Sequence, residues 1–391
     1  MFKRLLKKQL LKRFFKGKIL IITGARQTGK TTLVSEIQKE FEASGVVLFN
    51  CDNITDREKL KNRDLEFLQQ LIGNAKLIII DEAQKVENIG DTLKLLVDHY
   101  KQKKQIIVTG SSSINLLNNT QEPLTGRKYV YNLFTLSLSE IYDENYLKML
   151  KELDQLLLFG TYPEVVSQKS FSEKKILLRE LASSSIYKDI LAFQQVKSPD
   201  ILYNLLRALA LQIGSEVSYY ELSRKLGIDK NTVQHYIDLL EKSFIVFRLR
   251  PFFNNKRKEI SKSRKVYFYD LGIRNALIND FNFLENRNDT GALWENFIVT
   301  ERMKYKAYRQ IDVEQYFWRS YNGQEIDLVE EKNRKLSGYE IKWSESAKIK
   351  KPSLWKNGFK IINKENLKGF CFWFTFGGII GFLLIEVYCN E

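Results

Sequence analysis

The chain has 391 residues, 44% of them hydrophobic, and a formal net charge of +15. This length and apolar content exclude a disordered or fibrous chain and predict at least two closely packed domains, since there are only five prolines. Three cysteines without metal-like spacing and only two histidines argue against a disulfide framework, a zinc site or a histidine-based centre, and they favour the cytoplasm.

Positive charge gathers in three stretches of the sequence, residues 1–18, 246–275 and 342–368. Clustered lysine and arginine predict contact with a polyanion such as DNA, because each neutralised phosphate releases counterions. The alternative is a set of solvated lysine faces that bind nothing.

Residues 1–18 alternate Leu and Phe with Lys and Arg at helical spacing, which predicts a basic amphipathic helix and not a secretory signal. Such a helix can lie on anionic lipid. We expect instead that its apolar face packs on the next domain. That face consists of Leu5, Leu6, Leu10 and Phe14.

The segment from residue 19 to 32 carries the strongest functional signal. The apolar run 19–23 predicts a strand, which leads through a Gly-x4-Gly-Lys-Thr turn into a helix. In such a turn backbone N–H groups converge on phosphate oxygens, Lys30 contacts the β- and γ-phosphates, and Thr31 offers a hydroxyl to Mg²⁺. ATP and Mg²⁺ are therefore the expected ligands. The predicted binding residues are Gly24, Ala25, Arg26, Gln27, Thr28, Gly29, Lys30, Thr31 and Thr32.

A second apolar run, residues 77–80, predicts a buried parallel strand that ends in Asp81 and Glu82. We expect Asp81 to orient Mg²⁺ through its water shell and Glu82 to polarise the water that attacks the γ-phosphate. The alternative is that both acids cap the N-terminus of a helix.

A third strand, residues 105–110, leads into a run of serines. We predict that Ser111, with Thr109 as the second choice, contacts the γ-phosphate or the lytic water. Arg127 follows in a turn, where an arginine offered in cis or by a neighbouring subunit can stabilise the transferring phosphoryl group. A surface arginine in a turn is the alternative.

From about residue 15 to about residue 365 the chain resembles the prokaryotic AAA-type ATPases that carry a C-terminal domain of unknown function. The resemblance implies a P-loop ATPase core, a helical segment, a winged-helix-like portion and a C-terminal domain of the PD-(D/E)XK nuclease-like superfamily. It rests on GARQTGKTT (24–32), LIIIDEAQ (77–84), VTGSSS (108–113), LTGR (124–127), LFTLSLSE (133–140) and GTYPEVV (160–166).

Residues 218–249 predict a helix that ends near Gly227, a second helix capped by Asp229 or Asn231, and a strand. This pattern is typical of a helix-turn-helix with a wing, which binds DNA or serves as a structural module. The residues expected to face a groove are Lys230, Asn231, Gln234 and His235. Basic residues expected to follow the phosphate backbone are Lys242, Arg248, Arg250, Lys256, Arg257 and Lys258.

Acidic residues in the C-terminal third suggest a second site. Glu295 lies in a predicted helix, Asp327 in a strand, and Glu340 and Lys342 share one face of the next strand. Such carboxylates suit Mg²⁺ or Mn²⁺, and a lysine beside them can activate water for phosphodiester cleavage. The alternative is a set of cross-strand salt bridges. The family resemblance implies that these four residues match the acid, Asp, Glu and Lys positions of the nuclease-like superfamily.

We therefore predict an α/β protein with a P-loop NTPase parallel sheet (1–150), a helical and winged-helix region (151–255), and a mixed α/β restriction-endonuclease-like domain (256–391). The first hypothesis is a Mg²⁺-dependent ATPase whose conformational switch is coupled to DNA binding or processing, with a homo-oligomer if Arg127 acts in trans. The second is a nucleotide-dependent switch that binds a partner and has an inactive C-terminal domain. Residues 369–385 are short for a bilayer span and predict a strand pair, with a membrane anchor as the alternative.

Overall fold

The computed structural model describes residues 2–61, 64–110, 123–143, 145–191, 198–253, 264–320 and 323–343. Within these ranges no helix has the length and apolar content needed to cross a bilayer. Three predictions lie outside the described residues: the phosphate contact of Ser111, the backbone contacts of Lys256, Arg257 and Lys258, and the strand pair at 369–385.

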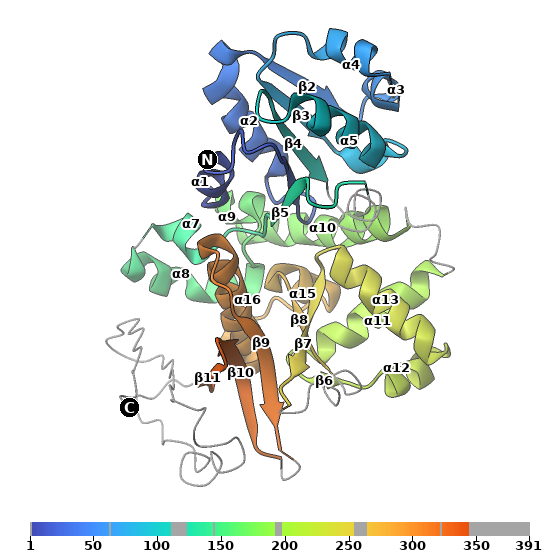
Figure 1. The fold of residues 1–391 in the computed structure, drawn as a ribbon. Coiled ribbons are helices and arrows are strands. Elements are labelled where there is room, and N and C mark those ends of the chain that lie inside the picture. The colour runs from blue at the N-terminus through green and yellow to red at the C-terminus, as the bar shows by residue number, and fades with distance from the viewer. Residues whose placement is uncertain are drawn as a thin grey trace.

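The N-terminal part is a five-stranded parallel sheet with helices on both faces (Figure 1). Its strand order is β2-β3-β4-β1-β5, so that β2 and β5 are the edges. The predicted α/β parallel sheet is confirmed, and β1, β3 and β4 lie where the apolar runs predict them. The strands are β1 (Ile19–Thr23), β2 (Val46–Asn50), β3 (Leu77–Asp81), β4 (Gln105–Gly110) and β5 (Lys128–Asn132).

Alternate residues of β1 enter two different cores. Ile19 and Ile21 pack with α3, α4 and α5, whereas Leu20 and Ile22 pack with α1 and α2. Because both faces are covered, every residue of β1 and β3 is buried. The helices of this part are α1 (Leu6–Leu11), α2 (Lys30–Phe41), α3 (Ile54–Lys61), α4 (Leu65–Ile72) and α5 (Ile89–Tyr100), with short 3-10 turns η1 (Glu42–Ser44) and η2 (Ala83–Lys85).

The amphipathic N-terminal segment packs on the sheet domain as predicted. Leu6, Leu10 and Phe14 are buried against α2 and the neighbouring strands. The helix itself has only six residues, which is shorter than the periodic pattern suggests.

The remaining chain is a helical layer followed by a second sheet (Figure 1). Its largest core joins residues from Tyr142 to Ile341, so the elements between them fold around one apolar interior. The helices are α7 (Leu138–Tyr142), α8 (Tyr146–Phe159), α9 (Pro163–Ser167), α10 (Phe171–Leu191), α11 (Pro199–Leu211), α12 (Tyr219–Leu226), α13 (Lys230–Lys242), α15 (Leu271–Leu277), η3 (Leu284–Asn286) and α16 (Thr290–Arg309).

The second sheet crosses the domain boundary predicted at residue 255. Its order is β11-β10-β9-β7-β8-β6, and the parallel pairing of β7 with β9 joins the strands that follow α13 to the C-terminal strands. The two regions expected to be separate therefore share one sheet. Its strands are β6 (Glu216–Val217), β7 (Val246–Pro251), β8 (Arg264–Phe268), β9 (Glu314–Arg319), β10 (Glu325–Lys332) and β11 (Lys335–Tyr339).

Two local predictions have different outcomes. The helix pair at 218–242 is confirmed, because α12 ends before Gly227 at φ +65° and Asp229 Oδ1 accepts the N–H of Asn231 at 2.8 Å. The strand expected to run through Glu340 to Trp343 is wrong at its end, since β11 stops at Tyr339. The Asp327 carboxylate accepts the N–H of Ile341 at 2.8 Å, so this N–H donates to a side chain instead of to a strand partner.

Candidate functional site

The turn after β1 has the backbone that a phosphate-binding loop requires. A Cβ on Gly24 would lie 2.2 Å from the carbonyl oxygen of Leu133, so no other residue fits there. Gly29 has φ +92°, in the left-handed region that glycine tolerates best, and α2 begins at the next residue. The N-terminus of α2 therefore opens directly onto the loop, where its unpaired N–H groups favour an anion.

Lys30 is buried beneath this loop, with 5% of its surface exposed. Its ammonium donates to the carbonyl oxygens of Gly24 at 2.9 Å and Ala25 at 2.8 Å. These partners are neutral, so the positive charge of Lys30 is held inside the loop without a carboxylate among these contacts.

Thr31 and Asp81 face each other across the end of the sheet. Thr31 Oγ1 donates to Asp81 Oδ2 at 3.0 Å, and Thr109 Oγ1 donates to the other oxygen, Asp81 Oδ1. A hydroxyl and a buried carboxylate at this spacing are the hard oxygen ligands that Mg²⁺ prefers, so the pair fits the predicted metal. Thr109, which was the second candidate after Ser111 for a contact with the γ-phosphate or the lytic water, thus contacts Asp81 directly.

Glu82 lies beside this pair in a left-handed backbone conformation, φ +53°. Its N–H donates to Thr109 Oγ1 at 3.2 Å, which ties the position of Glu82 to the same threonine that holds Asp81. The carboxylate is half-buried and accepts a hydrogen bond from Gln84 Nε2. The structure therefore brings Lys30, Thr31, Asp81 and Glu82 together at the carboxyl ends of the parallel strands.

Arg127 lies at the opposite ends of the strands, where β1 and β5 begin. Its carbonyl accepts the N–H of Ile19, the first residue of β1, at 2.9 Å, and its guanidinium pairs with Asp98 at 2.6 Å. The P-loop begins after the last residue of β1, about 13 Å away at the usual rise per strand residue. This placement contradicts a role of Arg127 in cis. A role in trans stays a prediction.

Arg4 was missed by the sequence reasoning, and it connects the P-loop with the segment after β5 and with α16. It is 5% exposed, and its guanidinium donates to the Thr28 carbonyl in the P-loop and to the Phe134 carbonyl at 2.7 Å. It also pairs with Glu140 at 3.0 Å and contacts the hydroxyl of Tyr308, on α16, at 3.2 Å. The sequence signal that bears on this contact is the Ser137-x-x-Glu140 spacing of a capping box, which marks Glu140 as a structural acid. In the structure the N–H of Ser137 donates to Glu140 at 2.9 Å.

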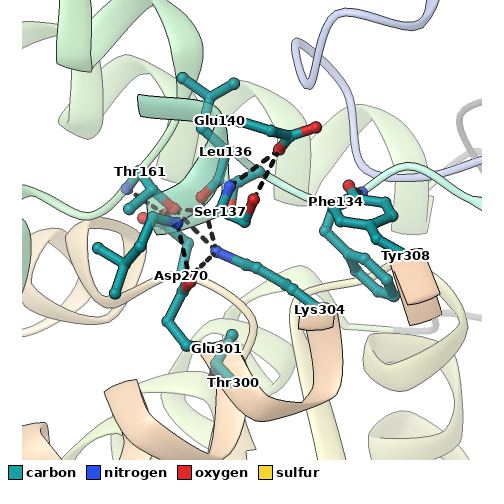
Figure 2. Close-up of polar contacts among 12 residues, drawn as sticks. Phe134, Leu136, Ser137, Glu140, Thr161, Asp270, Thr300, Glu301, Lys304 and Tyr308 are labelled. Atoms are coloured by element: carbon teal, nitrogen blue, oxygen red, sulfur yellow. Dashed lines mark hydrogen bonds and ion pairs between the residues drawn. The ribbon is translucent and has the colours of Figure 1, made fainter. Parts of the chain in front are cut away.

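Two motifs of the family resemblance that lie outside the P-loop meet at α16 (Figure 2). Lys304 is 1% exposed and donates to the Leu136 carbonyl at 2.9 Å and to Thr161 Oγ1 at 3.1 Å. Glu301 pairs with Lys304 at 2.8 Å and accepts the N–H of Leu138 at 2.9 Å. The segments 133–140 and 160–166 therefore form the joint between the sheet domain and the C-terminal helix.

The C-terminal carboxylates do come together, but around a lysine that was not predicted. Lys265, on β8, is 3% exposed and pairs with Glu295 at 2.9 Å, with Asp327 at 3.7 Å, and with Glu325. The hydroxyl of Tyr267 donates to Glu295 at 2.6 Å. We call these five residues the Lys265 cluster.

Lys265 contacts all three carboxylates of this cluster. Burial lowers the pKa of Lys265, but Glu295 and Asp327 outweigh burial and raise it overall. Burial raises the pKa of Glu295, Lys265 lowers it, and the Asp327 charge raises it. Among the described residues no group of three or more His, Cys, Asp or Glu side chains is placed to hold a metal ion. The residues present therefore do not fit the predicted metal, and an ammonium group lies among the carboxylates instead.

Glu340 and Lys342 form a pair next to the Lys265 cluster. Lys342 Nζ lies 2.8 Å from Glu340 Oε1, and 53% of the lysine side chain is exposed. Burial raises the pKa of the Glu340 carboxyl, the hydrogen bond from Lys342 lowers it, and the charge of Asp327 raises it. The four predicted residues are thus neighbours, with each acid committed to a partner within the protein.

The predicted DNA-facing side of α13 is in part accessible. Lys230, Asn231 and Gln234 are exposed, and His235 is half-buried. Arg248, which was expected to follow a phosphate backbone, instead pairs with Asp238 at 2.6 Å and with Glu241. Because Arg248 is paired with these two acids, the structure does not support the predicted contact of Arg248 with a nucleic acid.

Comparison with known protein families divides the chain into three matched segments. Residues 16–142 match a family described as an AAA domain, residues 150–283 a domain of unknown function (DUF8612), and residues 290–370 a domain of unknown function (DUF4143). The first match contains the P-loop, Asp81 and Thr109, so the N-terminal part is an AAA-type P-loop ATPase domain that binds nucleotide. The other two descriptions assign no activity, and the nuclease-like character of the C-terminal part stays a prediction.

Similar proteins occur in bacteria and archaea. An uncharacterized protein of Mycobacterium tuberculosis is 28% identical over 344 residues, which cover 87% of this chain and 74% of the relative. An uncharacterized protein of Methanocaldococcus jannaschii is 24% identical over 90% of this chain and 81% of its own length. Among solved structures, a Walker-type ATPase of Pyrococcus abyssi aligns with a TM-score of 0.47 and 16% identity, covering 71% of this chain and 96% of that one.

Proposed function

We propose that the protein hydrolyses ATP in a Mg²⁺-dependent reaction at the P-loop. The observation that carries this proposal is the hydrogen bond of 3.0 Å between Thr31 and Asp81, next to the buried ammonium of Lys30. These residues come from different elements and converge where the loop and the N-terminus of α2 favour phosphate.

Each residue has a distinct role in this proposal. Lys30 and the loop N–H groups bind the β- and γ-phosphates, and Thr31 and Asp81 hold Mg²⁺, which supplies positive charge to the phosphates when bound. Glu82 accepts a proton from the water that attacks the γ-phosphorus as the bond to ADP breaks. Thr109 is a positioning residue, because it contacts both Asp81 and the backbone of Glu82.

The test replaces Glu82 and measures binding and turnover separately. Glu82→Gln should retain binding of a fluorescent ATP analogue and lower phosphate release by about 100-fold to 10,000-fold, the usual contribution of a general base. Glu87→Gln is the matched control, since Glu87 is an exposed acid five residues further along the chain. Equal turnover of both variants and the wild type would refute the role of Glu82.

We further propose that the nucleotide state is transmitted to the C-terminal part through Arg4. Arg4 is the buried cation that contacts the P-loop carbonyl of Thr28 and the α16 hydroxyl of Tyr308 at the same time. A shift of the loop when phosphate binds changes the geometry of this guanidinium and therefore biases α16. This arrangement supports a nucleotide-driven conformational switch.

For the C-terminal part, the contacts favour a switch that binds a partner over a nuclease. A nuclease of the predicted kind needs carboxylates that are free for a divalent cation, whereas Glu295, Glu325 and Asp327 face Lys265. We propose DNA as a partner, contacted by the exposed residues Lys230 and Asn231 of α13.

A plasmid assay separates these alternatives. We expect the wild type to retain plasmid DNA, and we expect about tenfold weaker retention by the Lys230→Ala, Asn231→Ala double variant. The wild type should not nick the plasmid with Mg²⁺ or Mn²⁺. The control is the double variant Arg224→Ala, Lys225→Ala on the exposed side of α12. Nicking that disappears in Asp327→Ala would refute the non-cleaving assignment, and equal retention by both double variants would refute the α13 contact.

A further inference from the structure

The amino-terminal ends of the parallel strands, opposite the P-loop, carry many basic side chains. Four loops enter β1, β3, β4 and β5 at these ends, and we call them together the amino edge: residues 16–18, 73–76, 101–104 and 124–128. The four loops contain eight lysines and arginines and no acidic residue. They are Lys16, Lys18, Lys76, Lys101, Lys103, Lys104, Arg127 and Lys128.

These loops form one continuous surface. The N–H of Ile19 donates to the Arg127 carbonyl at 2.9 Å, and the N–H of Gln105 donates to the Lys76 carbonyl at 2.9 Å. A Cβ on Gly17 would lie 3.7 Å from Gln102 Cγ, which places the first loop against the third. Basic residues that are far apart in the sequence are therefore neighbours on the surface.

Four of the eight basic side chains at the amino edge are exposed to solvent. Arg127 is neutralised by Asp98 on α5. Lys16, Lys76, Lys101 and Lys103 are exposed. Burial lowers the pKa of Lys104, and the charge of Lys76 lowers it further, as expected where cations are close together.

We propose that the amino edge binds the phosphate backbone of a nucleic acid. Four adjacent strands span about 14 Å at the usual spacing of 4.8 Å, and that length of duplex carries about eight phosphate charges. The four exposed lysines, Lys16, Lys76, Lys101 and Lys103, can contact phosphates on the side of the duplex that faces the amino edge. This surface is distinct from α13, and the inference does not depend on the contact proposed there.

The shape and composition of the amino edge favour nucleic acid over a lipid surface. Peripheral membrane binding combines basic groups with apolar side chains that enter the bilayer. Within the described chain, no exposed large apolar side chain belongs to these four loops. Two of the aromatic rings nearby are already covered by cations, since Lys18 lies 4.8 Å from the ring centre of Tyr129 and Lys104 lies 5.0 Å from that of Tyr100.

The amino edge and the nucleotide site lie at opposite ends of the same strands. About 13 Å of β1 separates them, so that nucleotide and nucleic acid can be bound together. Every strand that ends near the P-loop begins in this basic surface or beside it. The ATPase domain itself would then hold the nucleic acid, and the C-terminal part would remain accessible to a further partner.

The test compares two triple variants of the full-length protein that lose the same charge. Lys16→Gln, Lys101→Gln, Lys103→Gln alters exposed residues of the amino edge, and Lys151→Gln, Lys169→Gln, Lys332→Gln alters exposed residues elsewhere. The probes are a fluorescein-labelled 30-base-pair DNA duplex, an RNA duplex of equal length, and vesicles of phosphatidylcholine with phosphatidylglycerol. Binding is followed by anisotropy or sedimentation at several salt concentrations, and ATP hydrolysis is measured without nucleic acid.

The wild type should bind at least one duplex, with affinity that falls steeply as salt rises. The amino-edge variant should bind at least tenfold more weakly and reduce the magnitude of the log–log salt slope by about three, since each phosphate contact contributes about 0.9. The control variant should change binding less than twofold, and both should hydrolyse ATP like the wild type. Equal loss in both variants, no binding of either duplex, or binding of vesicles alone would overturn the proposal.

Discussion

Two buried lysines in this protein have opposite surroundings. Lys30 is 5% exposed and donates to the main-chain carbonyls of Gly24 and Ala25. Lys265 is 3% exposed and lies among the carboxylates of Glu295, Glu325 and Asp327. Both lie beside acidic residues that the sequence presents as metal ligands.

The comparison shows that the partners of a lysine, and not its burial, decide whether its charge is available to a ligand. The carbonyl oxygens of Gly24 and Ala25 orient Lys30 and carry no formal charge, so these two contacts do not neutralise the ammonium. Three carboxylates surround Lys265, and its single positive charge is shared among them. The first set of contacts holds a lysine at the phosphate-binding turn, whereas the second holds a lysine among carboxylates.

The largest expected effect comes from replacing each lysine by methionine. Lys30→Met should lower ATP hydrolysis by about 100-fold to 1,000-fold, as the loss of one stabilising charge at a transferring phosphoryl group typically does. Lys265→Met should leave hydrolysis within about threefold of the wild type, measured at a temperature where the variant is folded. A comparable loss in both variants would erase the distinction between the two sites.

The second effect is on stability and concerns Lys265. Removing one partner of a buried ion pair costs about 3–5 kcal/mol, so Lys265→Met should lower the free energy of unfolding in urea by that order. Lys342→Met is the control, because Lys342 is 53% exposed and its pair with Glu340 is worth about 0–1 kcal/mol. Equal stability of the two variants would show that the Lys265 cluster is not a buried unit.

The stability loss in Lys265→Met should also depend on pH. Burial raises the pKa of Glu295, and without Lys265 this pKa rises further. A carboxyl group with a raised pKa in the folded state binds protons that the unfolded chain does not yet bind, so lowering the pH stabilises the fold. The difference from the wild type should therefore shrink from pH 8 to pH 5. A difference that grows over this range would contradict the assignment.

The smallest expected effect concerns Arg4, a third buried cation with partners of both kinds. Arg4 binds the carbonyls of Thr28 and Phe134 and the carboxylate of Glu140. Arg4→Lys keeps the charge but loses the fork of donors, so kcat/KM for ATP should fall about tenfold while the protein stays folded by circular dichroism. A positioning role predicts that protection of α16 from hydrogen exchange by bound nucleotide is also lost. Unchanged protection would contradict the coupling.

The sequence correctly places β1, β3 and the contact between Thr31 and Asp81, because the signals for them are local. An apolar run followed by glycines, or by an acid, marks the end of a buried strand, and parallel strands bring Thr31 and Asp81 to the same edge of the sheet. The glycines of the loop and the cap at Asp229 are recognisable for the same reason, since each depends on neighbours within a few residues.

The joint and the Lys265 cluster depend on contacts that no local pattern contains. Arg4 and Tyr308 are 304 residues apart in the chain, and Lys265 and Glu295 are 30 apart on different elements. Lys265 also falls in a stretch interpreted as surface charge, because a basic strand residue looks the same whether it faces solvent or acids. The predicted role of Arg127 in cis was wrong for a related reason. A short motif does not reveal whether its turn lies at the amino or the carboxyl ends of the strands.

The parallel pairing of β7 with β9 has a consequence for dividing the protein into fragments. A chain cut near residue 255 would leave β7 without both neighbouring strands, β8 and β9, and its exposed N–H and C=O groups would pair with another strand edge. Such a truncation should self-associate when expressed, whereas a cut in front of α8 leaves the second sheet whole.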